Sequence, residues 1–131
     1  MDTNESEPTL DRGQVASQVS RQIVQLHARL YGRGPTRAKT YIEDDYVLCV
    51  LEEIFTPAEL TLIRADKAEH VEATRRAFQE AVNAEFIEVV EAATGATVRA
   101  FMSQVDIEGQ MAVELFFFQP SAQQPDEPDR P

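Results

Sequence analysis

The chain has 131 residues, of which 43% are hydrophobic, and its 23 acidic and 12 basic side chains give a formal net charge of −11. This length fits one domain with one hydrophobic core and excludes separate cofactor and substrate domains. The acidic balance excludes nucleic acid as a general partner, because phosphate backbones require a basic surface. The single cysteine, Cys49, excludes an internal disulfide and a multi-cysteine zinc site.

The two ends of the chain differ in composition from its middle. Residues 1–11 contain four acids and no base, and residues 121–131 are rich in Pro, Gln and acid. Such segments bury too little apolar surface to offset their ordering entropy. We therefore expect a disordered acidic tail over 1–11, a single domain over 12–120 and a disordered tail over 121–131.

The sequence also predicts where the protein resides. Its start has no cationic region followed by an apolar one, as a secretory signal would. No segment reaches the roughly 18 continuous apolar residues that a spanning helix needs. We therefore expect a cytoplasmic protein that does not insert into a membrane.

The first half of the domain is predicted to form a helix and a β-hairpin. A helix from about Asp11 to Tyr31 follows from apolar residues spaced three and four apart, and Gly32 ends it. The apolar positions are Val15, Val19, Ile23, Leu26 and Leu30. Residues 38–43 and 46–52 are β-branched and aromatic, which predicts two strands joined by a tight turn at Asp44 and Asp45.

The second half is predicted to form helices and a second hairpin. Thr56, Pro57 and Glu59 match a capping box with a first-turn proline, so a short helix begins near Pro57. A periodic apolar run between Asp66 and Gly95 predicts one long helix. This run comprises Val71, Thr74, Phe78, Val82, Phe86, Val89 and Ala93. Strands are expected at 97–106 and 111–118.

This order of elements predicts an α+β fold, with a four-stranded, mainly antiparallel sheet and helices packed on one face. The last strand is apolar on both faces except at Glu114. Helices on one side only would leave Phe116 and Phe118 exposed. We therefore predict a homodimer whose interface includes Leu115, Phe116 and Phe118.

A basic cluster is the first candidate binding site. Arg29, Arg33, Arg37 and Lys39 fall within eleven residues that contain no acid. Arginine forks and loop amides bind phosphates and carboxylates, which predicts an anion site at Arg33, Arg37 and Lys39. The alternative interpretation is that these side chains only offset a helix dipole and keep the surface soluble. The nearby glycines do not follow the phosphate-loop pattern.

An acidic cluster is the second candidate. Glu43, Asp44 and Asp45 at the first turn, with Glu52 and Glu53 after the next strand, could supply part of a Mg²⁺ or Ca²⁺ shell. No known loop pattern supports this, and a turn with solvated acids is the favoured interpretation. We predict no metal site.

The remaining reactive side chains do not indicate catalysis. His27 and His70 are isolated and are expected to be surface or packing residues. Cys49 lies in a predicted buried strand, where a thiol is inert. The serines lack the sequence context of a nucleophile. We therefore predict no catalytic residue and no cofactor.

Three segments resemble the MpsC-like family of small bacterial domains. They are Tyr31 to Thr40 (YGRGPTRAKT), Leu48 to Thr56 and Arg99 to Ser103, and the resemblance covers about residues 12–119. The family takes its name from a sodium-translocating, membrane-potential-generating system, whose other components resemble a transport apparatus linked to inorganic carbon supply. The resemblance implies association with such a membrane system and carries no catalytic signature.

Taken together, these observations predict a non-enzymatic accessory or regulatory component of a sodium-linked, membrane-potential-generating or inorganic-carbon transport system. It would act as a small soluble homodimer, in the cytoplasm or peripherally at the inner face of the membrane, with a transport-system subunit as partner. The alternative is a regulator that binds a small anion, such as a nucleotide or phosphate, at Arg33, Arg37 and Lys39. An enzyme that uses Asp44 and Asp45 ranks last.

Overall fold

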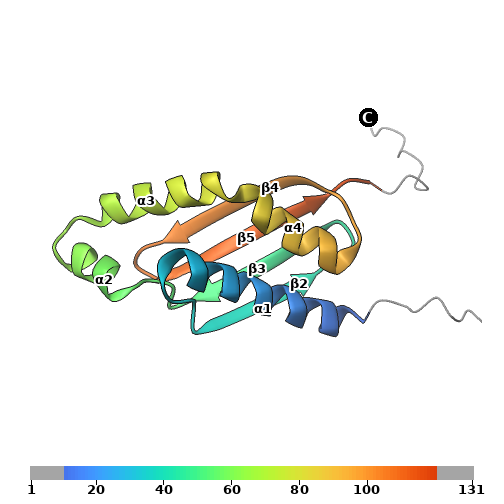
Figure 1. The fold of residues 1–131 in the computed structure, drawn as a ribbon, viewed down its shortest axis with the longest axis horizontal. Coiled ribbons are helices and arrows are strands. Elements are labelled where there is room, and N and C mark those ends of the chain that lie inside the picture. The colour runs from blue at the N-terminus through green and yellow to red at the C-terminus, as the bar shows by residue number, and fades with distance from the viewer. Residues whose placement is uncertain (1–10, 121–131) are drawn as a thin grey trace, which may run out of the picture.

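Two antiparallel hairpins join into one four-stranded sheet with the strand order β2-β3-β5-β4 (Figure 1). The computed structural model describes residues 11–120, so the predicted disorder of 1–10 and 121–131 falls outside the described residues. The elements are α1 (Arg12–Tyr31), β2 (Arg37–Ile42), β3 (Tyr46–Glu52), α2 (Pro57–Arg64), α3 (Ala68–Ala81), α4 (Asn83–Thr94), β4 (Val98–Asp106) and β5 (Met111–Phe118). The predicted α+β fold is confirmed.

The helix layer covers one face of this sheet. α1 and α4 lie side by side across the strands, and α3 extends from α4 along the outer strand β4 (Figure 1). Residues in β3 and β5 alternate strictly between buried and half-buried. This alternation is typical of a sheet with one face in the core and the other face uncovered.

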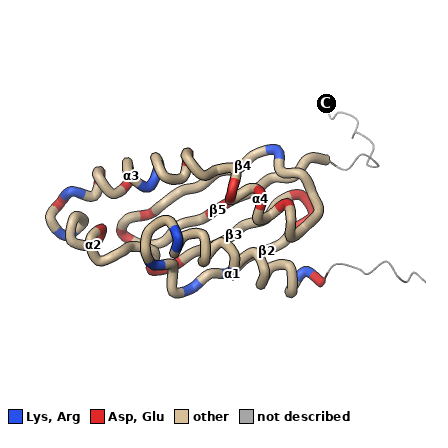
Figure 2. The backbone as a smooth tube through the Cα atoms, in the orientation of Figure 1, with Lys and Arg blue, Asp and Glu red and all other residues tan. Residues whose placement is uncertain are grey.

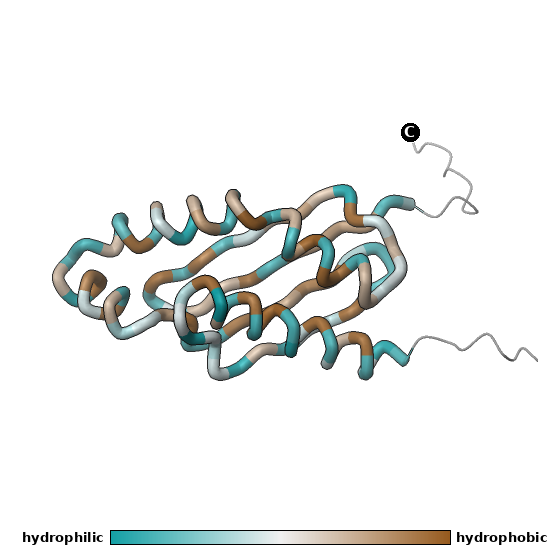
Figure 3. The backbone as a smooth tube through the Cα atoms, in the orientation of Figure 1, coloured by the Kyte–Doolittle hydropathy of each residue, from teal (hydrophilic) through white to brown (hydrophobic). Residues whose placement is uncertain are grey.

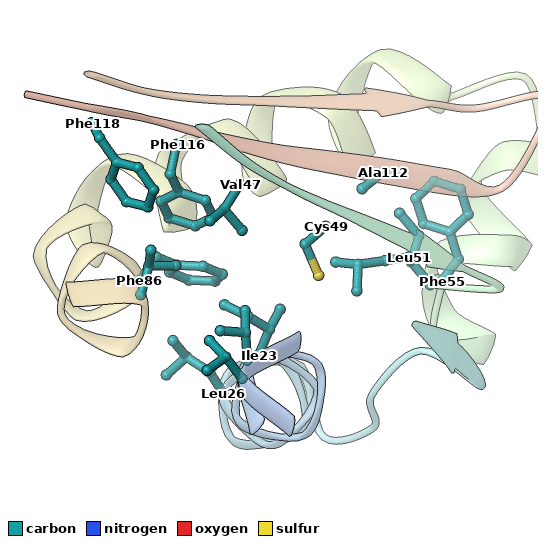
Figure 4. Packing of buried hydrophobic residues seen from close by; sticks show 14 of the residues in the cluster. Ile23, Leu26, Val47, Cys49, Leu51, Phe55, Phe86, Ala112, Phe116 and Phe118 are labelled. Carbon is teal, nitrogen blue, oxygen red and sulfur yellow. The ribbon is translucent and has the colours of Figure 1, made fainter. Parts of the chain in front are cut away.

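The core lies between α1, α4 and the two central strands. Ile23 of α1 points toward Cys49 of β3, and Leu26 lies on the side of Phe86 (Figure 4). At the other end of the core, Phe86 of α4 points toward β5. The apolar stripe of α1 therefore packs on the buried face of the sheet, as its spacing predicts.

The predicted helix boundaries follow from local capping. Asp11 caps α1 by accepting hydrogen bonds from the Gly13 and Gln14 amides at 3.0 and 3.3 Å. Gly32 ends the helix with a φ of 87°, which glycine adopts without strain. The Thr56 hydroxyl and the Glu59 carboxylate form the expected capping box at the start of α2.

The single long helix predicted between Asp66 and Gly95 is wrong, because the chain forms two helices that meet at Val82. This residue has φ −120° and ψ 19°, outside helical geometry. The break turns α4 so that its Phe86 and Val90 face the core, whereas Phe78 of α3 stays 39% exposed. The apolar spacing continues through Val82, so the sequence pattern contains no sign of the change in direction.

The prediction that Phe116 and Phe118 lie on the uncovered face is also wrong. Both are buried, at 0% and 8% exposure, and both point from β5 toward the helices (Figure 4). The apolar side chains on the uncovered face belong to the alternate residues, among them Leu115 and Phe117. Of the three predicted interface residues, therefore, only Leu115 lies there.

We predict that Gly34→Ala destabilises the fold by about 1–3 kcal/mol, the usual range for overpacking. A Cβ at position 34 would lie 2.8 Å from the Val24 carbonyl oxygen of α1. That contact is with backbone, so the loop between α1 and β2 must move. Chemical denaturation would measure the change.

The matched control is Gly13→Ala. The nearest atom to a Cβ there is the capping oxygen Oδ1 of Asp11 at 3.3 Å, and a small shift of this side chain relieves the contact while the cap is kept. Alanine is also the better helix former by up to about 1 kcal/mol. A Gly34→Ala protein as stable as the wild type would contradict the close packing of this loop on α1.

Candidate functional site

A polar cleft of about 370 Å³ opens between α1, α3 and the β4–β5 hairpin. Its floor includes Ser103 of β4 and Ala112 and Glu114 of β5. Ser103 lies opposite Glu114 in the strand register, and Ala112 lies two residues along the same face of β5. Because these two neighbours are small, the helix-covered side of the sheet has a hollow beside the carboxylate.

Glu114 and His27 form a buried polar pair in this cleft. Glu114 is 1% exposed and His27 of α1 is 3% exposed. Their facing atoms, His27 Nε2 and Glu114 Oε2, are 3.4 Å apart. Within residues 11–120, neither ring nitrogen of His27 nor Oε1 of Glu114 has a hydrogen-bond partner. Buried polar atoms are nearly always hydrogen-bonded, so this pair has unused hydrogen-bonding capacity.

Arg75 of α3 also lines the cleft, but its charge is already compensated. Its guanidinium donates to both oxygens of the Glu59 carboxylate, at 2.6 and 2.8 Å, and to the Ile54 carbonyl at 2.8 Å. It also stacks 3.8 Å above the Tyr31 ring. Arg75 therefore joins α3 to α2 and α1, and Glu59 rather than Glu114 neutralises it.

The same contacts shift the pKa values of Glu59 and Tyr31. Partial burial raises the pKa of Glu59, but hydrogen bonds from Arg75 and the Thr56 backbone, with the Arg75 charge, outweigh it and leave that pKa below its ordinary value. Burial raises the pKa of Tyr31 above its ordinary value, partly offset by the Arg75 charge. Glu59 is thus held as a carboxylate and Tyr31 as a neutral phenol.

Sequence reasoning did not identify this cleft, although two of its residues carry a signal. His27 continues the spacing of four from Val19 and Ile23, and Arg75 follows Val71 at the same spacing. A titratable residue on an apolar helical stripe is expected to be buried. His27 is therefore a buried residue and not a surface one, whereas His70 is exposed. For Glu114, the only signal in the sequence is that it is the one polar residue of its strand.

The predicted anion site is not assembled in the structure. Arg33 donates to the Phe55 carbonyl at 2.5 Å, and Arg37 forms an ion pair with Glu52 at 2.7 Å. Lys39 lies with its ammonium 5.3 Å from the centre of the Tyr41 ring. Arg37 and Lys39 share one face of β2, but Arg33 is held at the Phe55 carbonyl, so the structure does not bring all three together, and anion binding at this loop stays a prediction.

The acidic residues of the first hairpin also have local partners. Asp44 pairs with Arg12 at the start of α1, and Glu53 accepts a hydrogen bond from the Thr36 hydroxyl. Between residues 11 and 120, no three His, Cys, Asp or Glu side chains form a group that could hold a metal ion. Cys49 is fully buried, and this burial raises the pKa of its thiol to about 12. The thiol is therefore protonated at neutral pH.

The uncovered face of the sheet is the second candidate surface. We call it the open face and define it by six apolar side chains, Tyr41, Leu48, Val50, Met102, Val113 and Leu115. Four of them form one row in register across all four strands, in the order Tyr41, Leu48, Leu115 and Met102. Tyr41 is 44% exposed and Met102 is 56% exposed.

Charge and hydropathy are unevenly distributed around this sheet. Most charged positions lie on the helices and near the ends of the strands (Figure 2). Hydrophobic positions recur along the strands as well as on the helices (Figure 3). A contiguous apolar patch on an otherwise polar protein marks an interaction surface.

We predict that Glu59→Gln lowers the free energy of unfolding by about 2 kcal/mol at neutral pH, because Arg75 loses the charge that compensates it. Glutamine still fits a capping box, so the substitution isolates the charge. The pKa of Glu59 is lowered in the folded state, so its stabilising effect is complete above the ordinary pKa and disappears as pH falls through the folded pKa.

The difference between the wild type and Glu59→Gln should therefore shrink below about pH 4. Urea denaturation at several pH values would measure it. Glu108→Gln, which removes an exposed carboxylate from the β4–β5 turn, serves as the matched control. A difference that stays constant down to the lowest pH would show that the ion pair is not its cause.

Comparison with known proteins assigns a family. None of the helices within residues 11–120 is long and apolar enough to cross a membrane. No curated protein and no solved structure matches the chain significantly. Residues 11–120 match the family described as the Na⁺-translocating membrane potential-generating system (MpsC). The match spans nearly all of the chain, including the cleft and the open face, and so the chain belongs to the MpsC family.

Proposed function

We propose that the chain is a non-catalytic accessory or regulatory component of the sodium-translocating, membrane-potential-generating system after which its family is named. We further propose that it acts as a homodimer joined through the open face. The observation that carries the proposal is the apolar row that runs across all four strands of this face. The protein would work in the cytoplasm or at the inner face of the membrane, together with a subunit of the transport system.

A second copy of the chain fits the open face because the strand register makes this face self-complementary. Consider two sheets packed face to face around a two-fold axis that runs along the strands between β3 and β5. β2 of one copy then faces β4 of the other. Tyr41 lies opposite Met102 of the second copy, and Leu48 lies opposite its Leu115.

The charges at the two edges of the sheet favour the same arrangement. Arg37 and Lys39 lie on β2, and Asp106 shares the register row of Arg37 at the opposite edge, on β4. The two-fold axis along the strands brings Arg37 opposite Asp106 of the second copy. A two-fold axis across the strands would instead bring the two β2 edges together, with their basic side chains.

The open face is large enough for a dimer of modest affinity. Four strands at the usual spacing, with about seven residues each, give a face about 19 Å wide and about 23 Å long. This footprint of about 440 Å² per copy, or about 880 Å² in total before side-chain relief is counted, lies below the roughly 1,200–2,000 Å² of stable interfaces and in the range of weak, transient ones. The dimer should therefore dissociate on dilution.

We predict that Leu115→Asp converts the dimer into a folded monomer, because it places a charge at the centre of the apolar row. Sedimentation velocity over a range of concentrations would measure the association. Leu62→Asp, which changes a 37% exposed leucine of α2, is the matched control and should remain dimeric. A wild-type protein that sediments as a monomer at every concentration would contradict the dimer.

We also predict that removal of this protein from its native host lowers the sodium-dependent membrane potential. A potential-sensitive dye would measure it with and without sodium. Wild-type protein and Leu62→Asp should restore the potential, and Leu115→Asp should not if the dimer is the active form. An unchanged potential in the deletion strain would overturn the proposed function, whatever the oligomeric state.

A further inference from the structure

We propose that the cleft beside Glu114 and His27 binds a small organic cation that carries N–H groups, an amine or a guanidinium compound. The cleft lies on the helix-covered side of β5, and the open face lies on the other side of the same strand. The inference is therefore independent of the proposed dimer and of the transport role.

The first argument is the unsatisfied carboxylate. Glu114 is 1% exposed, and its neighbours along the same face of β5, Ala112 and Phe116, are apolar. Its Oε1 has no hydrogen-bond partner within the described residues. A buried carboxylate without donors is costly, so a ligand that supplies N–H groups gains more here than at a solvated acid.

The second argument is that the buried arginine in this cleft is already paired with another carboxylate. Arg75 is 4% exposed and lines the same cleft, but both oxygens of Glu59 already accept its hydrogen bonds. His27 Nε2 is 3.4 Å from Glu114 Oε2 without a hydrogen bond. Glu114 therefore keeps an acceptor for a donor that comes from outside the chain.

The third argument is the size and lining of the cleft. Its volume of about 370 Å³ exceeds that of a single buried water and falls in the range of roughly 300–1,000 Å³ for small-molecule sites. Gln79, Asn83 and Ser103 contribute polar side chains that can accept further N–H groups. Phe101, which is stacked on Phe116, adds apolar surface for the carbon chain of such a ligand.

The fourth argument is charge. Glu72, Glu80 and Glu114 line the cleft, and Arg76 is the remaining arginine there once Arg75 is paired with Glu59. The chain as a whole has a net charge of −11. This field repels phosphates and attracts cations. A bare metal ion is disfavoured, because residues 11–120 contain no group of three His, Cys, Asp or Glu ligands.

The experiment compares four probes by calorimetry and thermal shift on the full chain. Agmatine supplies a guanidinium and an ammonium group, putrescine supplies two ammonium groups, tetramethylammonium supplies a cation without any hydrogen-bond donor, and inorganic phosphate supplies an anion. Agmatine or putrescine should bind and raise the melting temperature with concentration. Tetramethylammonium should not, because it has no hydrogen-bond donor for Glu114. Agmatine and putrescine share one ammonium and the same four-carbon spacer, so tighter binding of agmatine would indicate a preference for the guanidinium and tighter binding of putrescine a preference for the second ammonium.

Glu114→Gln should weaken the binding by about tenfold or more, because the hydrogen bonds to a charged acceptor are lost. Glu108→Gln makes the same change in net charge outside the cleft and should bind like the wild type. If Glu114→Gln does not fold, Ser103→Leu narrows the cleft without changing a charge and should also abolish binding.

Three outcomes would overturn the proposal: no binding of agmatine or putrescine, equal binding of tetramethylammonium, or binding that survives both Glu114→Gln and Ser103→Leu. The first would mean that the cleft holds only water. Stabilisation by phosphate alone would point to the basic loop instead. None of these results would change sedimentation or the sodium-dependent potential, so failure of this proposal is distinguishable from failure of the proposed function.

Discussion

The alternation of side chains along β5 is the constraint on which the rest of the structure depends. This strand lies between β3 and β4, and successive residues point to opposite faces of the sheet. Ala112, Glu114 and Phe116 therefore meet the helices, whereas Val113 and Leu115 do not. The register of this one strand therefore determines where the core, the cleft and the open face lie. A shift of one residue would bury the open face and expel the phenylalanines.

The Arg75–Glu59 ion pair is the reason why a cleft remains beside β5. It joins α3 to the capped start of α2, and its third hydrogen bond ties both to the Ile54 carbonyl just after β3. Because the arginine is engaged there, it does not reach across to Glu114. The helix layer is therefore closed over Phe86 and Phe116 but open over Ser103 and Glu114. The same side chain that stabilises the fold therefore does not compensate Glu114, whose close basic neighbour is His27.

Much of the fold could be predicted from the sequence, because its signals are local. The cap at Asp11, the capping box at Thr56 and the alternation in β3 and β5 depend on near neighbours. The features that could not be predicted depend on distant contacts. The break at Val82 lies within an unbroken apolar pattern, and the face of β5 that the helices cover follows from strand order. The cleft joins residues 27, 75 and 114, whose proximity only the tertiary fold creates.

The break at Val82 makes α3 a separate helix that is joined to α4 through one non-helical residue. α4 packs against α1 and β4, whereas the main contacts of α3 are with α2. A helix of 14 residues is about 21 Å long, so a tilt of about 10° at Val82 displaces its far end by about 4 Å. Arg75 and Gln79 belong to α3 and form part of one wall of the cleft. The position of this wall therefore depends on the backbone angles at Val82 together with the Arg75–Glu59 pair that anchors α3.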